Sequence, residues 1–181
     1  MKVSLMPMES LLIVLEESDQ GETDRKVQPD DEHIKVLNLS WELVFHPVHG
    51  EPFHMETDQL FEFGMHQDTR ISTFGGQVSY KTTFNLERTV WAFLDLGPQK
   101  QITEVVLNGE NLGTRWWGRH LYPIDQDQLY LGANQLEIIY TTTLANYVNS
   151  LEENKVAKRW INLDQPESMG LTSEIKLLKG K

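Results

Sequence analysis

The stretch Ile102–Asp125, ITEVVLNGENLGTRWWGRHLYPID, decides the predicted fold of this chain. It begins with an apolar strand and turns at Asn108-Gly109, two residues that tolerate the positive φ of a tight hairpin. The stretch then continues into a dense group of flat and cationic side chains: Arg115, Trp116, Trp117, Arg119, His120 and Tyr122. An Asn-Gly turn between apolar runs indicates an antiparallel hairpin, so the chain is expected to be rich in β-strands.

The side chains after this turn form the candidate ligand-binding set, and Asn146 from a later segment joins it as a hydrogen-bonding group. Aromatic faces beside fixed hydrogen-bond donors suit a ligand with apolar C–H faces and many hydroxyls, such as a sugar. A competing hypothesis is that the tryptophans close the end of a β-sandwich core. Adjacent residues of a strand face opposite ways, so we expect at least one of Trp116 and Trp117 to lie in the core.

The composition is that of one soluble globular domain with an acidic surface. Of the 181 residues 39% are hydrophobic, which is enough for one core. The formal net charge is -11, with 27 acidic and 16 basic residues. This balance argues against general binding to nucleic acid and against adhesion to anionic membranes. There are no cysteines, so neither disulfides nor thiolate metal sites are expected, and cysteine usage does not indicate a compartment.

Metal binding is a weaker hypothesis on this sequence. His46, His49 and His54 invite a zinc site, but they surround prolines and lack the spacing of two ligands on one helical face. Asp125 and Asp127 could supply oxygen ligands to a structural calcium, although no ordered calcium-binding motif is present. We therefore predict no cofactor and keep a structural calcium as the alternative.

Composition also divides the chain into three parts. Residues 1–17 contain the apolar run SLLIVL and are predicted to be the terminal strand of a preceding domain. Residues 18–33 are rich in Asp, Glu, Gln and Gly, which is typical of a linker. The main folded domain is expected to begin at residue 34 and to continue to residue 181.

Within residues 34–181, apolar alternation and turn residues predict a series of short strands. Their ranges are 34–45, 77–86, 89–96, 102–107, 134–143 and 173–178. Helical spacing is visible in one place, residues 145–154. A parallel α/β fold would need a helix after each strand. We therefore predict an all-β antiparallel β-sandwich, or jelly roll, with one short helix.

Several motifs in this chain resemble the galactose-binding-like modules of glycoside hydrolases. The run FGGQVSYKTTF at residues 74–84 resembles their F-S-G-x-x-x-Y-x-x-x-F motif, and residues 94–97 match L-D-L-G. Residues 108–116 match the N-G-x-x-L-G-x-x-W part of V-x-x-N-G-x-x-L-G-x-x-W, residues 132–137 resemble G-x-N-x-L-E, and residues 169–178 resemble the closing strand of those modules. In these motifs the chain resembles the C-terminal modules of alpha-L-rhamnosidase-like enzymes and modules of family 2 glycosidases.

This resemblance implies a non-catalytic, carbohydrate-associated module of a larger glycoside hydrolase, whose catalytic carboxylates lie in a separate domain. The module would contact glycan, support the catalytic domain of the same polypeptide, or do both. The alternatives are a structural docking module without a sugar site and a stand-alone sugar-binding protein. No catalytic site is expected within this chain. A secreted parent enzyme would place the module in an extracellular or periplasmic location, whereas the sequence itself indicates no compartment.

Overall fold

The computed structural model describes residues 27–160 and 163–181, which form ten strands and three short helices. The strands are β1 (Pro29–Val36), β2 (Trp41–Pro47), β3 (Phe53–Thr57), β4 (Gly76–Leu86), β5 (Phe93–Pro98), β6 (Ile102–Leu107), β7 (Glu110–Arg115), β8 (Arg119–Pro123), β9 (Gly132–Thr141) and β10 (Lys176–Gly180). The helices are α1 (Thr69–Ser72), α2 (Ala145–Ser150) and α3 (Lys155–Trp160). The strand predicted within residues 1–17 lies outside the described residues.

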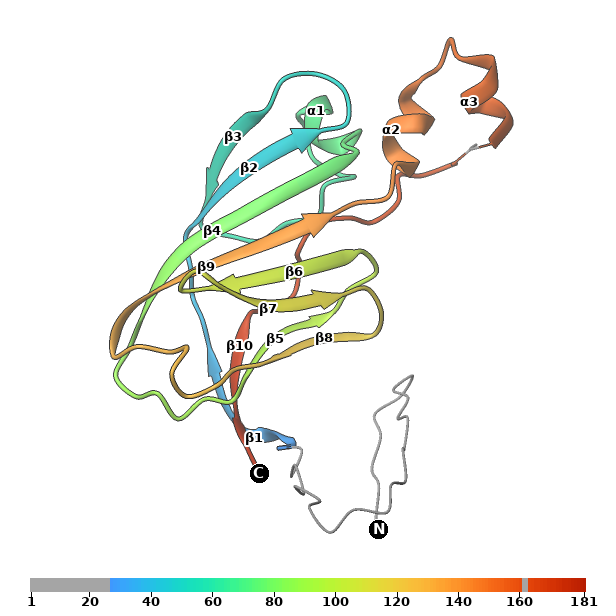
Figure 1. Ribbon diagram of the computed structural model, residues 1–181. Helices are drawn as coiled ribbons and strands as arrows, with labels where there is room; N and C mark the ends of the chain where they lie inside the picture. The colour runs from blue at the N-terminus through green and yellow to red at the C-terminus, as the bar shows by residue number, and fades with distance from the viewer. Residues whose placement is uncertain (1–26, 161–162) are drawn as a thin grey trace, which may run out of the picture.

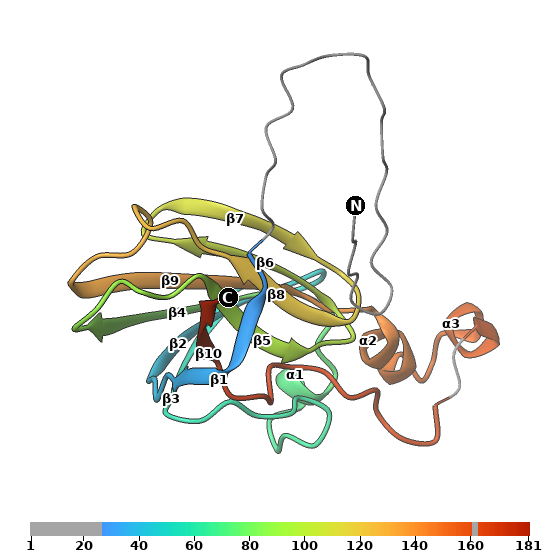
Figure 2. The same ribbon diagram turned by 90° about the horizontal axis from the view of Figure 1, so that it is seen from below.

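The ten strands form two antiparallel sheets packed face to face (Figure 1; Figure 2 shows the layers from below). One sheet has four strands in the order β1-β10-β5-β8, and the other has six in the order β3-β2-β4-β9-β6-β7. The helices lie at one end of the sandwich (Figure 1). In the chain, α2 and α3 come between β9 and β10, and they project from the sandwich. This arrangement confirms the predicted all-β antiparallel sandwich.

The main core fills the space between the sheets because alternate residues of each strand face inward. On β4 the inward residues include Val78, Tyr80 and Phe84, all of them buried, as the period-two pattern predicts. Leu94 of β5 and Leu177 of β10 approach from the four-stranded sheet and belong to the same apolar cluster. Each such side chain stabilises the fold by about 1.5–3 kcal/mol through removal of apolar surface from water.

The Asn108-Gly109 hairpin connects β6 and β7 as predicted. Asn108 and Gly109 have φ values of 52° and 87°, so both occupy the positive-φ region that a tight two-residue turn requires. The Asn108 side chain also donates to the carbonyl oxygen of Gln128 and to Asn134 Oδ1, and it accepts a hydrogen bond from the backbone N–H of Gln135. The turn is therefore fastened to the loop before β9 and to β9 itself.

The strand predicted over residues 34–45 is two strands in opposite sheets. β1 pairs with β10 in the four-stranded sheet, and β2 pairs with β3 and β4 in the six-stranded sheet. Residues 37–40 make the crossing, where the Leu37 N–H donates to the carbonyl oxygen of Ile175. β1 also begins at Pro29, inside the range predicted as a linker, because its pairing with β10 orders a polar segment that has no apolar pattern.

The predicted single helix is also divided, and the described residues contain three helices instead of one. The range 145–154 contains α2 and then a turn at Leu151–Asn154, after which α3 begins. Asn154 causes this restart because its Oδ1 accepts hydrogen bonds from the backbone N–H groups of Val156 and Ala157. The third helix, α1, has an N-cap at Asp68, whose side chain accepts a hydrogen bond from Arg70 N–H.

Candidate functional site

The two adjacent tryptophans lie on an exposed turn between β7 and β8. Trp116 is 69% exposed and Trp117 is 59% exposed. The expectation that at least one of them lies in the core is wrong, because β7 ends at Arg115 and the alternation of strand side chains stops there. We name Trp116, Trp117 and Gly118 the aromatic turn.

Hydrogen bonds on both sides hold the backbone of the aromatic turn in place. The Gln99 N–H donates to the Gly118 carbonyl oxygen over 3.2 Å, which joins the turn to the segment between β5 and β6. Arg115 Nε donates to the carbonyl oxygen of Leu121, and its Nη1 donates to that of Thr114, each over 3.1 Å. Because the strands beneath are fixed, the two indole rings are presented from a preorganised support.

The two arginines of the candidate set are occupied by contacts within the chain. The Arg115 guanidinium carbon lies 5.2 Å from the centre of the Tyr122 ring, so its charge stacks on that ring. Arg119 Nη2 lies 2.8 Å from a carboxylate oxygen of Asp95 and 2.8 Å from one of Asp31. The hydrogen bond to Asp95 raises the pKa of Arg119 above its usual range. These cations connect strands of the sandwich.

His120 and Tyr122 are fully buried and form a polar network with Thr103 of β6. Tyr122 Oη donates to the carbonyl oxygen of Thr103 over 2.8 Å, and Thr103 Oγ1 lies 2.6 Å from both Tyr122 Oη and His120 Nδ1. Every proton has an acceptor if Thr103 Oγ1 donates to Tyr122 and His120 Nδ1–H donates to Thr103. His120 Nε2 is then a buried acceptor without a partner among the described residues.

Burial also sets the protonation state of this network. Removal from water lowers the pKa of His120 to about 4, and the nearby Arg115 charge acts in the same direction. Burial raises the pKa of Tyr122, although its hydrogen bond to Thr103 opposes this shift. Both side chains are therefore neutral near neutral pH, and they lie inside the sandwich and away from its surface.

Asn146 is buried at the base of α2, where it connects two segments of the chain. Its Nδ2 donates to the carbonyl oxygen of Glu167 over 2.9 Å, and its Oδ1 accepts from the Glu167 N–H over 2.6 Å. The side-chain amide thus pairs with the backbone as a neighbouring strand would. Of the seven residues predicted to bind ligand, only the two tryptophans present most of their surface to solvent, and their role in binding remains a prediction.

The described residues contain no group of three or more His, Asp or Glu side chains placed to hold a metal ion. Asp125 and Asp127 are exposed in the loop between β8 and β9, and His46, His49 and His54 are exposed on or beside β2 and β3. In the same part of the chain, no helix is long and apolar enough to cross a membrane.

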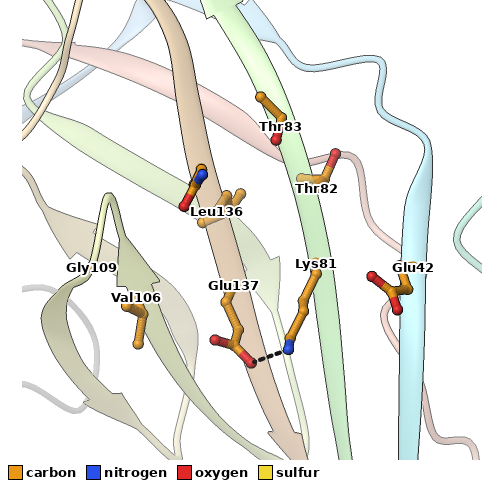
Figure 3. A pocket seen from close by; sticks show the side chains of 9 residues that line it. Glu42, Lys81, Thr82, Thr83, Val106, Gly109, Leu136 and Glu137 are labelled. Atoms are coloured by element: carbon orange, nitrogen blue, oxygen red, sulfur yellow. Dashed lines mark ion pairs between the residues drawn. The ribbon is translucent and has the colours of Figure 1, made fainter.

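A polar hollow on the outer face of the six-stranded sheet was not predicted from the sequence. It has a volume of about 410 Å³ and is lined by side chains from four neighbouring strands and the hairpin turn (Figure 3). Glu42 of β2, Lys81 of β4 and Glu137 of β9 lie in one cross-strand row, and Lys81 Nζ is 3.7 Å from Glu137 Oε1. Thr83 and Gln135 form the next row. The side chains of these five residues all point outward from their strands. Only the order of the strands in the sheet places them side by side.

The fold and these two surfaces define an antiparallel β-sandwich module with an exposed aromatic turn at one end and a polar hollow on one face. In solved structures, the same fold occurs as one part of larger enzymes. Rhamnosidase from Novosphingobium sp. PP1Y is similar over 88% of this chain, with a TM-score of 0.67 and 21% identity. The beta-glucuronidase of Ruminococcus gnavus is similar over 83% of this chain, with a TM-score of 0.57 and 17% identity.

One curated sequence is also related to this chain. A protein of Formosa agariphila named "Putative beta-glucuronidase" is 31% identical to it over 94 residues, which is 49% of this chain and 8% of that protein. No protein-family model matches the sequence. The chain corresponds to 16% of the rhamnosidase chain and 30% of the R. gnavus chain. The similarity is therefore to one module of much longer glycoside hydrolases.

Proposed function

We propose that this chain is a non-catalytic accessory module of a larger glycoside hydrolase and that it contacts glycan through the aromatic turn. The fold supports a module of this kind, because the similar structures contain it as a minor part of a rhamnosidase and of a beta-glucuronidase. Catalysis is assigned to another domain of that polypeptide. Galactose-binding-like and jelly-roll character, as the sequence motifs suggest, belong to the same proposal.

The observation that carries the glycan contact is the exposure of Trp116 and Trp117 on a fixed turn. Burying an indole ring against the C–H face of a sugar removes apolar surface from water on both partners. Keeping two such rings exposed has no evident benefit to the sandwich itself, whose core is complete without them. Ligand contact explains this exposure directly.

Tryptophan fluorescence during glycan titration tests the proposal. Neutral plant oligosaccharides and monosaccharides are added to the protein, and a saturable change in emission is expected for at least one of them. Trp117→Ala is expected to remove most of that response while the thermal unfolding curve stays close to that of the wild type. Trp91→Phe is the matched control, because Trp91 is partly buried against the core and away from the aromatic turn. A response that survives in a Trp116→Ala/Trp117→Ala variant would contradict the proposal.

Domain docking is a second candidate function, and the outer face of the four-stranded sheet favours it. Ile34, Leu178, Phe93 and Pro123 form one apolar row across β1, β10, β5 and β8. Phe93 and Leu178 in the middle of this row are buried within the chain, whereas Ile34, at 44%, and Pro123 are exposed at its two ends. The outer face of the six-stranded sheet carries charged residues instead. A neighbouring domain of the same polypeptide would contact the exposed end of the row at Ile34. Ile34→Ser would then weaken the attachment of that domain in the full-length enzyme, measured by limited proteolysis, and unchanged proteolysis would argue against docking there.

A further inference from the structure

We infer that the polar hollow on the outer face of the six-stranded sheet is a second binding site, which takes a short, uncharged saccharide. The inference rests on the proposed function for the class of ligand, but it concerns residues that the aromatic turn does not include. The volume of about 410 Å³ falls within the range of known small-ligand sites, about 300–1,000 Å³. The hollow extends from β2 to β6, a distance of about 14 Å at the usual strand spacing, which suits an oligosaccharide better than a single ring.

The hollow has a rigid floor. β4 and β9 form ten registered pairs, and each of these strands is paired on its other side as well, with β2 and β6 respectively. A site on central strands of a sheet changes little on binding, so little entropy is lost when a ligand is held there. Because the backbone groups of β4 and β9 are used within the sheet, a peptide cannot add to it as a further strand. Recognition therefore depends on side chains.

The side chains around the hollow have unused hydrogen-bonding capacity. Among the described residues, the Thr83 hydroxyl and the Gln135 carboxamide have no hydrogen-bond partner, whereas the nearby Asn108 side chain is fully engaged. The 3.7 Å separation of Lys81 Nζ and Glu137 Oε1 is too long for a good hydrogen bond, so both keep capacity for a ligand. The side chains of Lys81 and Glu137 are 48% and 34% exposed, which leaves them accessible. Donors and acceptors thus alternate within reach of one another, as the hydroxyls of a sugar require.

The charges around the hollow exclude an anionic ligand. Glu42 and Glu137 flank Lys81, so the local charge is negative even with the ammonium in place. Glu56 lies directly opposite Glu42 on β3 and adds to this potential. A uronate or a sulfated sugar would meet net repulsion, whereas neutral hydroxyls can donate to the carboxylates and accept from Lys81. The inferred ligand is therefore neutral.

Nuclear magnetic resonance titration of the ¹⁵N-labelled protein tests the inference. The probes are cellotetraose, xylotetraose and mannotetraose as neutral saccharides, and trigalacturonate as the anionic one. We expect at least one neutral probe to shift the backbone amides of Lys81, Thr83, Gln135 and Glu137, and trigalacturonate to leave them unchanged. If no neutral probe shifts these amides, or if trigalacturonate shifts them equally, the inference is overturned.

Two variants make the test specific. Thr83→Ala/Gln135→Ala removes two neutral hydrogen-bonding groups and should weaken binding about tenfold or more, since each lost hydrogen bond lowers the affinity several-fold. Gln77→Ala is the matched control, because Gln77 lies on β4 outside the lining of the hollow. Glu42→Gln/Glu56→Gln/Glu137→Gln removes all three of these carboxylates, leaves Lys81 as the local charge and should produce binding of trigalacturonate. Absence of either effect in a variant whose spectrum shows a folded protein would contradict the assignment.

The aromatic turn and the hollow can fail independently. Trp116→Ala/Trp117→Ala should leave the amide shifts in the hollow intact. A saccharide that binds in the hollow, together with tryptophan variants that change nothing in any glycan titration, would contradict glycan contact by the aromatic turn. The inferred site in the hollow would then still be supported. If the tryptophan variants abolish the shifts at Lys81 and Gln135, the hollow is not a site of its own and the inference is wrong.

Discussion

His120 makes the stability of this protein depend on pH in a way that one substitution can isolate. Its pKa is about 4 in the folded chain, against an ordinary value of 6.5. Between these two values the unfolded chain binds a proton at this residue and the folded chain does not. The free energy of unfolding therefore falls as the pH is lowered through 6.5, and the loss is complete only below pH 4. From the two pKa values, the loss due to His120 at about pH 4.5 is about 2.5 kcal/mol.

Urea unfolding at about pH 7.5 and at about pH 4.5 measures this effect. His120→Gln keeps a side-chain N–H that can donate to Thr103 Oγ1 but cannot titrate, so its stability should fall by about 2.5 kcal/mol less than that of the wild type between the two pH values. Burial raises the pKa of the neighbouring Tyr122, so Tyr122 stays neutral across this range. His49→Gln serves as the control, because His49 is exposed on a loop. If the wild type and His120→Gln lose equal stability, His120 is not held neutral by burial and the reasoning is refuted.

Three further substitutions test other parts of the structure by thermal or urea unfolding. Asn146→Ala leaves the backbone groups of Glu167 without their partners and should cost about 1–3 kcal/mol; an unchanged stability would mean that α2 is not held by this pair. Gly170→Ala places a Cβ 2.6 Å from the Phe61 carbonyl oxygen at a φ of 99°, so a cost of about 3 kcal/mol or more is expected. Gly118→Ala has a φ of 74° but open space around it, so only about 1 kcal/mol is expected; equal costs at both glycines would contradict the packing at Gly170.

Sequence patterns predicted the features that depend on neighbouring residues. The Asn108-Gly109 turn forms because both residues tolerate positive φ, and the inward face of β4 follows from strict alternation. The division of residues 34–45 between two sheets was missed, because a crossing between sheets leaves no mark in an apolar pattern. Exposure of both tryptophans was missed as well, because alternation holds only as far as Arg115, where β7 ends.

The candidate sites depended far more on tertiary structure. Burial separates His120, Tyr122 and Asn146 from the two exposed tryptophans, although all five were equal candidates in the sequence. This separation arises because polar side chains can be satisfied inside a protein by partners distant in sequence.

By itself, the sequence determined an antiparallel sandwich with an Asn-Gly hairpin and a group of aromatic and cationic residues beyond it. It determined these because turn geometry and side-chain alternation are local properties of the backbone. Only the tertiary structure decided that Arg115 packs on Tyr122 and that Arg119 forms ion pairs with Asp95 and Asp31. It also decided that Glu42, Lys81 and Glu137 lie side by side on three neighbouring strands. Those contacts join residues between 7 and 88 positions apart, and strand order, which no local pattern encodes, is what brings the distant ones together.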